Sequence, residues 1–345
     1  MCLYHGDSHL LKLNLPEKKL MNPVETCEPT EAVEKLDAEE KLRSSKYSPE
    51  RIPRPETVGN QLIWGYLIVF ILFHAMLPLA FVPYFFSWTG VILLPLGHMI
   101  FDWLGIGLCF HRVLTHGGLV LPKWLERTFA VFGVLTLMDS PARWVAVHRK
   151  HHQHSDDQPD PHSPMVTFWW GHMEWLYREN EGMSDINFYH KYAPDVLRDR
   201  FYLTLERYRL WAWLYVAHAM VYFLAGLGCG WIWSGNYWGG LQFGLSLVLW
   251  GVIFRTVFTW HATFAVNSVT HRWGYRNYDT RDNSQNHWLV AALTGGEGWH
   301  NNHHAHPVSC MHGHRWWEFD PTYLAVRILA ALGLAKEVKT HDKNS

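Results

Sequence analysis

Four long apolar stretches constrain the fold of this chain more than any other feature of its sequence. A helix needs about 20 mainly apolar residues to cross the core of a bilayer. The chain reaches that length four times, at about residues 62–82, 87–110, 211–233 and 237–258. Residues 83–86 separate the first pair and Ser234-Gly235-Asn236 separates the second. The sequence therefore predicts an all-α integral membrane protein with four transmembrane helices in two hairpins.

The two hairpins predict which parts of the chain share one side of the membrane. Each hairpin returns the chain to its starting side, so residues 1–60, 111–210 and 262–345 lie together. These segments hold nearly all the Lys and Arg residues, whereas the two turns hold none. The positive-inside rule places the polar segments and both termini in the cytoplasm. We expect a cytoplasmic helical cap, on a bacterial inner membrane or the endoplasmic reticulum.

The rest of the chain predicts three regions. Residues 1–58 are polar with interleaved acids and bases, and we expect a disordered tail. Residues 59–335 form the membrane domain, and residues 336–345 a short C-terminal tail. Leu125–Val147 is apolar, but charged residues and Pro141 interrupt it. We interpret it as an interfacial or buried helix, since a fifth span would put the later histidines on the wrong side.

Histidine occurs 24 times, and nine of these residues form clusters next to the spans. The clustered residues are His111, His116, His148, His151, His152, His271, His300, His303 and His304. Two clusters have the spacing i, i+3, i+4, which places imidazoles on one face of a helix. His111 and His116 are spaced i, i+5 and would point roughly 140° apart on a regular helix. They can converge only at a helix end, at an irregular turn, or on two metals.

The number of clustered histidines indicates two metal ions. Imidazole nitrogen is a good ligand for iron, zinc or copper, and zinc usually takes four ligands. Nine are too many for one metal and suit two. Two redox metals at a membrane surface favour oxygen chemistry, with iron as the first candidate. We expect the other histidines, such as His5, His9 and His190, at the surface, and His74, His98 and His218 in hydrogen bonds between helices.

The histidine motifs resemble those of the membrane fatty acyl desaturases. HRVLTH at 111–116, HRKHH at 148–152 and HNNHH at 300–304 are similar to the family's three histidine boxes. NSVTH at 267–271, GEGWH at 296–300 and HSD with DPH at 154–162 resemble its flanking motifs. The resemblance covers about residues 60–330 and is closest to the delta-9, stearoyl-CoA desaturase-like group.

This resemblance implies roles for particular residues. The nine histidines occupy the family's di-iron ligand positions, and Asn267 occupies that of a residue reaching one iron through water. Asp157, Asp160 and Glu297 would orient imidazoles. No catalytic residue is implied beyond the di-iron site. The chain departs from the animal acyl-CoA enzymes at Ala146 and Val147, where those enzymes carry charged residues that contact coenzyme A.

The resemblance also implies a reaction and its partners. The expected activity is the oxygen-dependent insertion of a cis double bond, at the delta-9 position by family likeness, into a saturated acyl chain, with two Fe ions as cofactors and O2 as co-substrate. The substrate would be an acyl-CoA or an acyl-lipid, and electrons would come from a ferredoxin or cytochrome b5. Arg149, Lys150, Arg272 and Arg276 would steer an acidic donor. Phe168, Trp169, Trp170 and Trp175 would line or cap the acyl tunnel.

Two other classes of function stay open at this point. A related membrane hydroxylase or monooxygenase would share the boxes and the topology, although the NSVTH motif favours the desaturase. A metal transporter would place its ligands within the spans, whereas most of these clusters lie beyond them. The net charge of -1 gives no indication of a nucleic-acid partner.

Overall fold

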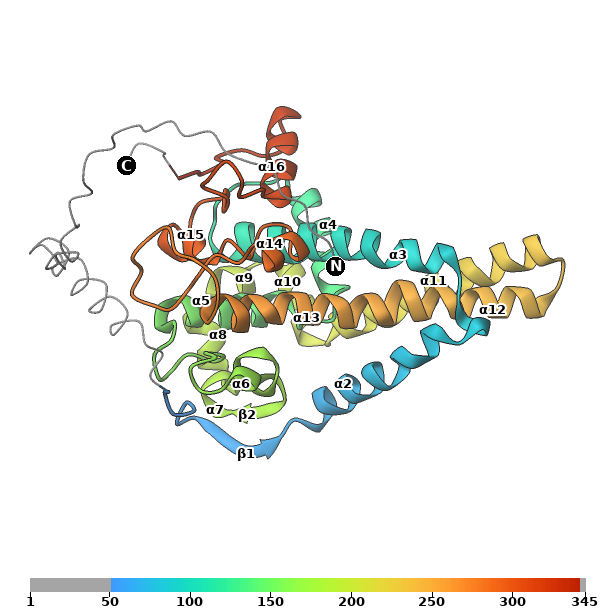
Figure 1. The fold of residues 1–345 in the computed structure, drawn as a ribbon, viewed down its shortest axis with the longest axis horizontal. Coiled ribbons are helices and arrows are strands. Elements are labelled where there is room, and N and C mark those ends of the chain that lie inside the picture. Colours follow the sequence, from blue (N-terminus) through green and yellow to red (C-terminus); the bar gives the residue numbers. More distant parts are fainter. Residues whose placement is uncertain (1–50, 342–345) are drawn as a thin grey trace, which may run out of the picture. The chain divides into compact units, whose positions relative to one another are not determined.

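The computed structural model describes residues 51–341. Most of the tail predicted at 1–58, with His5 and His9, lies outside the described residues. The described chain is mostly helical, as predicted (Figure 1). The long helices are α2 (Trp64–Met76) with η1 (Leu77–Phe81), α3 (Trp88–His98) with η3 (Met99–Thr115), α11 (Leu210–Ser234), and α12 (Tyr237–Val248) with η5 (Leu249–Phe254), α13 (Arg255–Ser268) and η6 (Val269–His271).

Shorter elements gather at one end of the long helices (Figure 1). They are α4 (Lys123–Val134), α5 (Pro141–His154), α6 (Phe168–His172), η4 (Glu174–Tyr177), α7 (Glu181–Ser184), α8 (Ile186–Tyr192), α9 (Pro194–Arg198), α10 (Arg200–Arg207), α14 (Trp288–Leu293), α15 (His300–Ala305) and α16 (Pro321–Ala331). The short helix η2 (Pro83–Phe85) lies instead in the turn at the opposite end. The strands β1 (Val58–Leu62) and β2 (Arg178–Asn180) form a small antiparallel sheet that the all-α prediction missed. Residues 116–209 and 272–341 are called the cap below.

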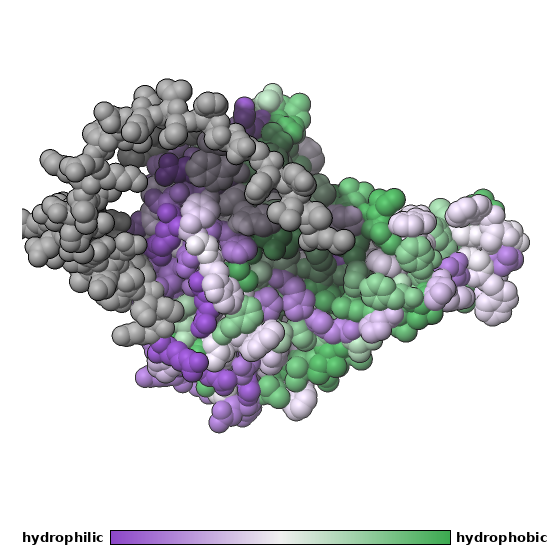
Figure 2. Space-filling view, in the orientation of Figure 1, coloured by the Kyte–Doolittle hydropathy of each residue, from purple (hydrophilic) through white to green (hydrophobic). Residues whose placement is uncertain are grey.

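Four described helices are long and apolar enough to cross a membrane, which confirms the predicted number of spans. They are Trp64–Phe81, Trp88–Thr115, Leu210–Ser234 and Tyr237–His271. Figure 2 shows hydrophobic residues along these helices and hydrophilic residues at the cap end. The hairpin arrangement across a bilayer, and the side on which the cap lies, stay predictions.

Polar caps and a glycine make the tight connections between the long helices. Ser87 begins α3 by accepting a hydrogen bond from the Gly90 N–H (3.0 Å), and Asn236 begins α12 by accepting one from Gly239 (2.9 Å). Gly235 ends α11 with φ at +70°, a left-handed conformation that glycine adopts without steric cost. The chain can therefore reverse direction within two residues between α11 and α12.

The second and fourth span helices continue beyond the predicted ends at residues 110 and 258. They run on to Thr115 and His271, so they leave the apolar zone and enter the cap without a break. Residues 259–268 stay helical, and they bury Trp260, Phe264 and Val266 against the cap and the neighbouring helices. Both helices contain a π-helical part, η3 and η5. Such wide turns occur frequently at functional sites.

The apolar stretch at 125–147 forms two buried helices, where a single one was predicted. Leu137 and Asp139 adopt positive φ between α4 and α5, and Pro141 supplies the first residue of α5 without needing a hydrogen-bond acceptor. The core of the cap forms where these helices meet η3, and it includes Phe110, Phe129, Ala142 and Val145. This packing holds α5 beside the end of the second span helix.

The hydrogen bonds expected between helices are confirmed for His74, His98 and His218. His218 of α11 accepts from Arg255 of α13 (3.5 Å). His98 contacts the Thr259 hydroxyl (2.9 Å) and the Leu293 carbonyl (2.6 Å). His74 of α2 lies 2.9 Å from His261 of α13, Nε2 to Nε2. Polar groups in a bilayer need such partners because lipid offers none.

The close contact of α11 and α12 generates a stability prediction. A Cβ at Gly226 would lie 2.7 Å from the Gly244 Cα, whereas a Cβ at Gly228 has nothing within 4 Å. Small residues let membrane helices approach closely, and overpacking costs about 1–3 kcal/mol. We expect Gly226→Ala to lower the midpoint of thermal unfolding in detergent and Gly228→Ala to leave it unchanged or slightly higher. Equal midpoints for the two variants would contradict this packing.

Candidate metal centre

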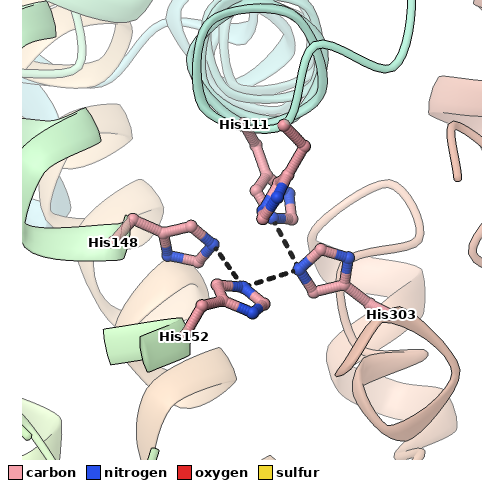
Figure 3. A group of neighbouring side chains, drawn as sticks. His111, His148, His152 and His303 are labelled. Carbon is pink, nitrogen blue, oxygen red and sulfur yellow. Dashed lines mark hydrogen bonds between the residues drawn. The ribbon is translucent and has the colours of Figure 1, made fainter. Parts of the chain in front are cut away.

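Five imidazoles from three helices converge in one buried group, called the five-histidine cluster. It contains His111 and His116 at the end of η3, His148 and His152 of α5, and His303 of α15. One nitrogen from each lies within 4.8 Å of the others. Figure 3 shows His111, His148, His152 and His303 pointing toward one centre, linked by Nε2–Nε2 distances of 2.9–3.1 Å.

The π-helical turn explains how His111 and His116 reach the same group. The His116 N–H donates to the His111 carbonyl (3.2 Å), which is the i+5 to i hydrogen bond of a π-helix. This turn is wider than an α-helical turn, so residues five apart fall on one face. Of the alternatives left open by the sequence, the structure shows the irregular turn at a helix end.

The other four predicted ligands form the four-histidine cluster. It contains His151 of α5, His271 of η6, and His300 and His304 of α15, again with one nitrogen of each within 4.8 Å of the others. His271 and His300 approach to 3.1 Å, Nε2 to Nε2. The structure thus brings all nine predicted histidines into two groups.

Each HxxHH box serves both clusters, which corrects the interpretation of a single stripe of three ligands. His148 and His152 point to the five-histidine cluster, while His151 points to the other. Neighbouring residues on an α-helix are rotated by roughly 100°, so His151 and His152 face in different directions. In α15 the division is reversed, with His303 in one cluster and His300 and His304 in the other.

Carboxylates hold four of the nine rings by their Nδ1 atoms. Glu297 accepts from His111 (2.5 Å) and Asp160 from His151 (3.0 Å), as the resemblance implied. Asp156 accepts from His271 (2.8 Å) and Asp282 from His304 (2.6 Å). A donated Nδ1–H fixes the tautomer and leaves the lone pair on Nε2, where a metal binds.

One of the predicted orienting residues is wrong by a single position. Asp157 is exposed, and Asp156 beside it makes the contact with His271. Asp156 adopts a positive φ of 61°, which turns its side chain inward to His271 and Ser163. The sequence motif contains both aspartates and could not separate them. Asp282 was missed altogether, because it lies in the loop after His271 with no motif around it.

The ring nitrogens of the two clusters have the unpaired lone pairs that metal binding requires. Among the described residues, the buried Nε2 atoms of His116, His151 and His304 have no hydrogen-bond partner. An orphaned polar atom costs about 1–3 kcal/mol when buried, and a metal ion would satisfy these lone pairs. All-imidazole groups of five and four suit two transition-metal ions such as iron.

Burial keeps four of these rings in the neutral form that binds metals. Desolvation lowers the pKa of His148, His152, His300 and His303 well below the ordinary value of histidine. Burial alone would raise the pKa of Asp282, but the adjacent His304 lowers it, so this carboxylate stays ionised. Neutral imidazoles with ionised partners are the state that a metal site needs.

A cavity of about 760 Å³ reaches the five-histidine cluster. Its wall includes His148, Asn267, and apolar residues of α2 and α13 such as Phe70 and Phe264. Of the four aromatic residues expected around a tunnel, Trp175 lines this cavity. Trp169 is exposed, Trp170 is buried beneath Arg54, and Phe168 stacks on His172, so these three line other parts of the cap.

The proposed steering cations are largely engaged in holding the cap together. Arg149 donates to the carbonyls of Leu114 and Thr115 and pairs with Asp195. Lys150 is buried, and Arg272 donates to the Pro164 carbonyl. Arg276 donates to the carbonyls of Thr280 and Asp282. These contacts hold the side chains in place in the cap, and their role in steering an electron donor stays a prediction.

A second hollow, of about 820 Å³, exposes the other side of the ligand groups. His116 and His152 of the five-histidine cluster and His304 of the four-histidine cluster line it. Arg281 lies on its rim and donates to the carbonyls of His152 and Gln153. Two hollows thus reach the histidine clusters. The first is the cavity lined by His148, and the second is lined by His116, His152 and His304.

Comparison with known proteins gives consistent matches. Residues 86–335 match the sequence model of the family named fatty acid desaturase. The chain is 40% identical over 292 residues to sn-2 palmitoyl-lipid 9-desaturase of Nostoc sp. (strain 36), which covers 84% of this chain and 93% of that protein. It is 41% identical over 283 residues to sn-1 stearoyl-lipid 9-desaturase of Anabaena variabilis, which covers 82% of this chain and 96% of that protein. It is 39% identical over 257 residues to an acyl-CoA 5-desaturase of Anemone leveillei, which covers 74% of each chain.

The two clusters predict a metal stoichiometry. We expect the purified wild type to bind two equivalents of iron and His303→Ala to bind about one or less, because this ring is central to the five-histidine cluster (Figure 3). His190→Ala, which alters an exposed histidine, is the matched control and should keep both ions. Metal analysis per mole of protein measures this. Full retention by His303→Ala would contradict the assignment.

Proposed function

The chain belongs to the fatty acid desaturase family and is an oxidoreductase that desaturates fatty acids; we propose that it is an oxygen-dependent di-iron enzyme that forms a cis double bond at the delta-9 position of a saturated acyl chain. One observation carries the proposal. Five and four imidazoles form two adjacent groups, and an apolar cavity leads to the first of them.

The chemistry requires an oxidant that side chains cannot supply. An unactivated methylene has no acidic proton, so bound iron with dioxygen would supply the oxidising power. The nine histidines would hold the two ions, and Asn267 would reach one of them through water. Asp156, Asp160, Asp282 and Glu297 fix the Nδ1 protons of their histidines, which keeps each Nε2 lone pair aimed at the centre of its cluster.

The electron balance calls for an outside donor. Removing two hydrogens from the chain provides two electrons and two protons. Reduction of dioxygen to two waters consumes four of each, so two electrons and two protons come from elsewhere. We propose a ferredoxin or cytochrome b5 as the source of the electrons. The hollow lined by His116, His152 and His304 supports an approach there, because it reaches ligand rings of both clusters.

The cavity would position the acyl chain. Val69 and Phe70 of α2, together with Trp260 and Phe264 of α13, line its apolar part, and the Phe70 ring stacks on Trp260. These walls exclude water from the carbons next to His148. The family motif and the names of the Nostoc and Anabaena relatives support the delta-9 position.

The polar part of the cavity wall supports an acyl-lipid substrate. It contains Asp139, Glu179 and Glu206 against Arg143 and Arg209. Arg143 is already paired with Asp139 (3.0 Å), which also accepts from the Tyr66 hydroxyl (2.8 Å). Acids outnumber bases here, so the wall repels rather than attracts the phosphates of coenzyme A. The Nostoc and Anabaena relatives are named as lipid desaturases.

Expression in a host without its own desaturase tests the reaction. We expect the wild type and His190→Ala to produce a cis monounsaturated acid with the double bond at carbon 9, and His303→Ala to produce none. Gas chromatography with mass spectrometry of double-bond adducts measures the product and its position. A hydroxylated acid would favour the monooxygenase alternative, and another double-bond position would refute the delta-9 assignment.

The form of the substrate can be tested with the purified enzyme. With a reduced donor and oxygen supplied, we expect a stearoyl glycerolipid in mixed micelles to be desaturated at least tenfold faster than stearoyl-CoA. The physical reason is the acidic excess in the cavity wall. Because salt screens such repulsion, added salt should narrow the difference. Faster turnover of the thioester at low salt would contradict the acyl-lipid proposal.

A further inference from the structure

The carboxylates around the metal centre are distributed unequally between the two clusters. In the four-histidine cluster, three of four rings donate Nδ1–H to aspartates: His151 to Asp160, His271 to Asp156 and His304 to Asp282. In the five-histidine cluster, His111 donates to Glu297, and it is the one ring with a carboxylate partner among the described residues. The Nδ1 atoms of His303 and of His300, one in each cluster, are buried without a partner, so the difference lies in the carboxylates alone.

The surrounding charges increase this inequality. Glu297 shares its carboxylate with Arg112 (2.9 Å), and Arg112 also pairs with Asp320 (3.1 Å). Around the four-histidine cluster, Asp156, Asp160 and Asp282 pair with histidine rings. Arg276 donates to the main-chain carbonyl of Asp282, and Arg281 lines a hollow together with Asp282 and His304. Three carboxylates thus pair directly with rings of this cluster, against one at the other, and that one is shared with an arginine.

Both features act on a metal ion in the same direction. A carboxylate on the far nitrogen makes an imidazole a more basic ligand, and removal of such a partner typically costs about 10–100-fold in metal affinity. The greater negative charge also stabilises a cation at short range in a buried site. We propose that the two metal positions are inequivalent, and that the four-histidine cluster binds its ion more tightly and fills first.

This inference rests on the proposed two-metal centre and can be tested without enzymatic activity. Metal-free, full-length protein in detergent is titrated with Co²⁺, and the visible absorption of the bound ion is followed. We expect two phases of one equivalent each in the wild type. Asp282→Asn keeps the size of the side chain and its hydrogen-bond acceptor but removes the charge. It should weaken the first phase by about 10–100-fold and leave the second unchanged.

Glu297→Gln is the matched variant at the other cluster. It should weaken the second phase and leave the first unchanged, so the unaffected phase in each variant also reports a folded protein. Asp160→Asn, which alters the partner of His151, should reproduce the effect of Asp282→Asn. It decides the question if the Asp282 variant does not fold.

The outcomes separate this inference from the proposed function. Two Co²⁺ ions bound with a single affinity, or a first phase weakened by Glu297→Gln and not by the aspartate variants, would overturn the inference and leave the two-metal centre intact. Binding of fewer than two ions by the wild type would overturn the centre itself. Two phases that respond separately to the two kinds of variant would establish the inequivalence.

Discussion

The burial of nine imidazoles in two adjacent groups is the constraint on which the rest of the structure depends. Each ring must be neutral, fixed in one tautomer and aimed at a common point, although burial makes unpaired nitrogens costly. Carboxylates meet part of this demand by accepting from Nδ1. The remaining Nε2 atoms of His116, His151 and His304 find no partner among the described residues. Metal ions bound in the two clusters would satisfy these lone pairs.

The long helices satisfy this constraint by running out of the apolar zone without interruption. His111 and His116 end the second span helix, and Asn267 and His271 end the fourth. A continuous helix is stiff, so these ligands are held at a fixed height above the hydrophobic zone. The fourth span helix also lines the cavity, through Trp260, Phe264 and Asn267. The positions of its ligands relative to the apolar zone and to the cavity are thus set together.

Local sequence patterns predicted the spans and all nine clustered histidines because hydropathy and spacing are properties of short segments. The division of each box between two clusters was not predicted, since it depends on how α5 and α15 face one another. The contact between His271 and Asp156, and that between His304 and Asp282, join residues 115 and 22 positions apart. Asp157 was preferred to Asp156 because spacing alone does not reveal a positive φ.

The elements that supply the ligands differ from those that supply their partners. Eight of the nine histidines lie within helical segments and His116 lies at a helix end, whereas Asp156, Asp160, Asp282 and Glu297 lie in loops between helices. Helices fix where the lone pairs point, and loops set how much negative charge surrounds them. Loops tolerate change better than packed helices. A change of a loop residue would therefore alter the affinity of one metal position while the ligand geometry stays constant. In this chain the loops place three carboxylates on the rings of the four-histidine cluster and one on the rings of the five-histidine cluster.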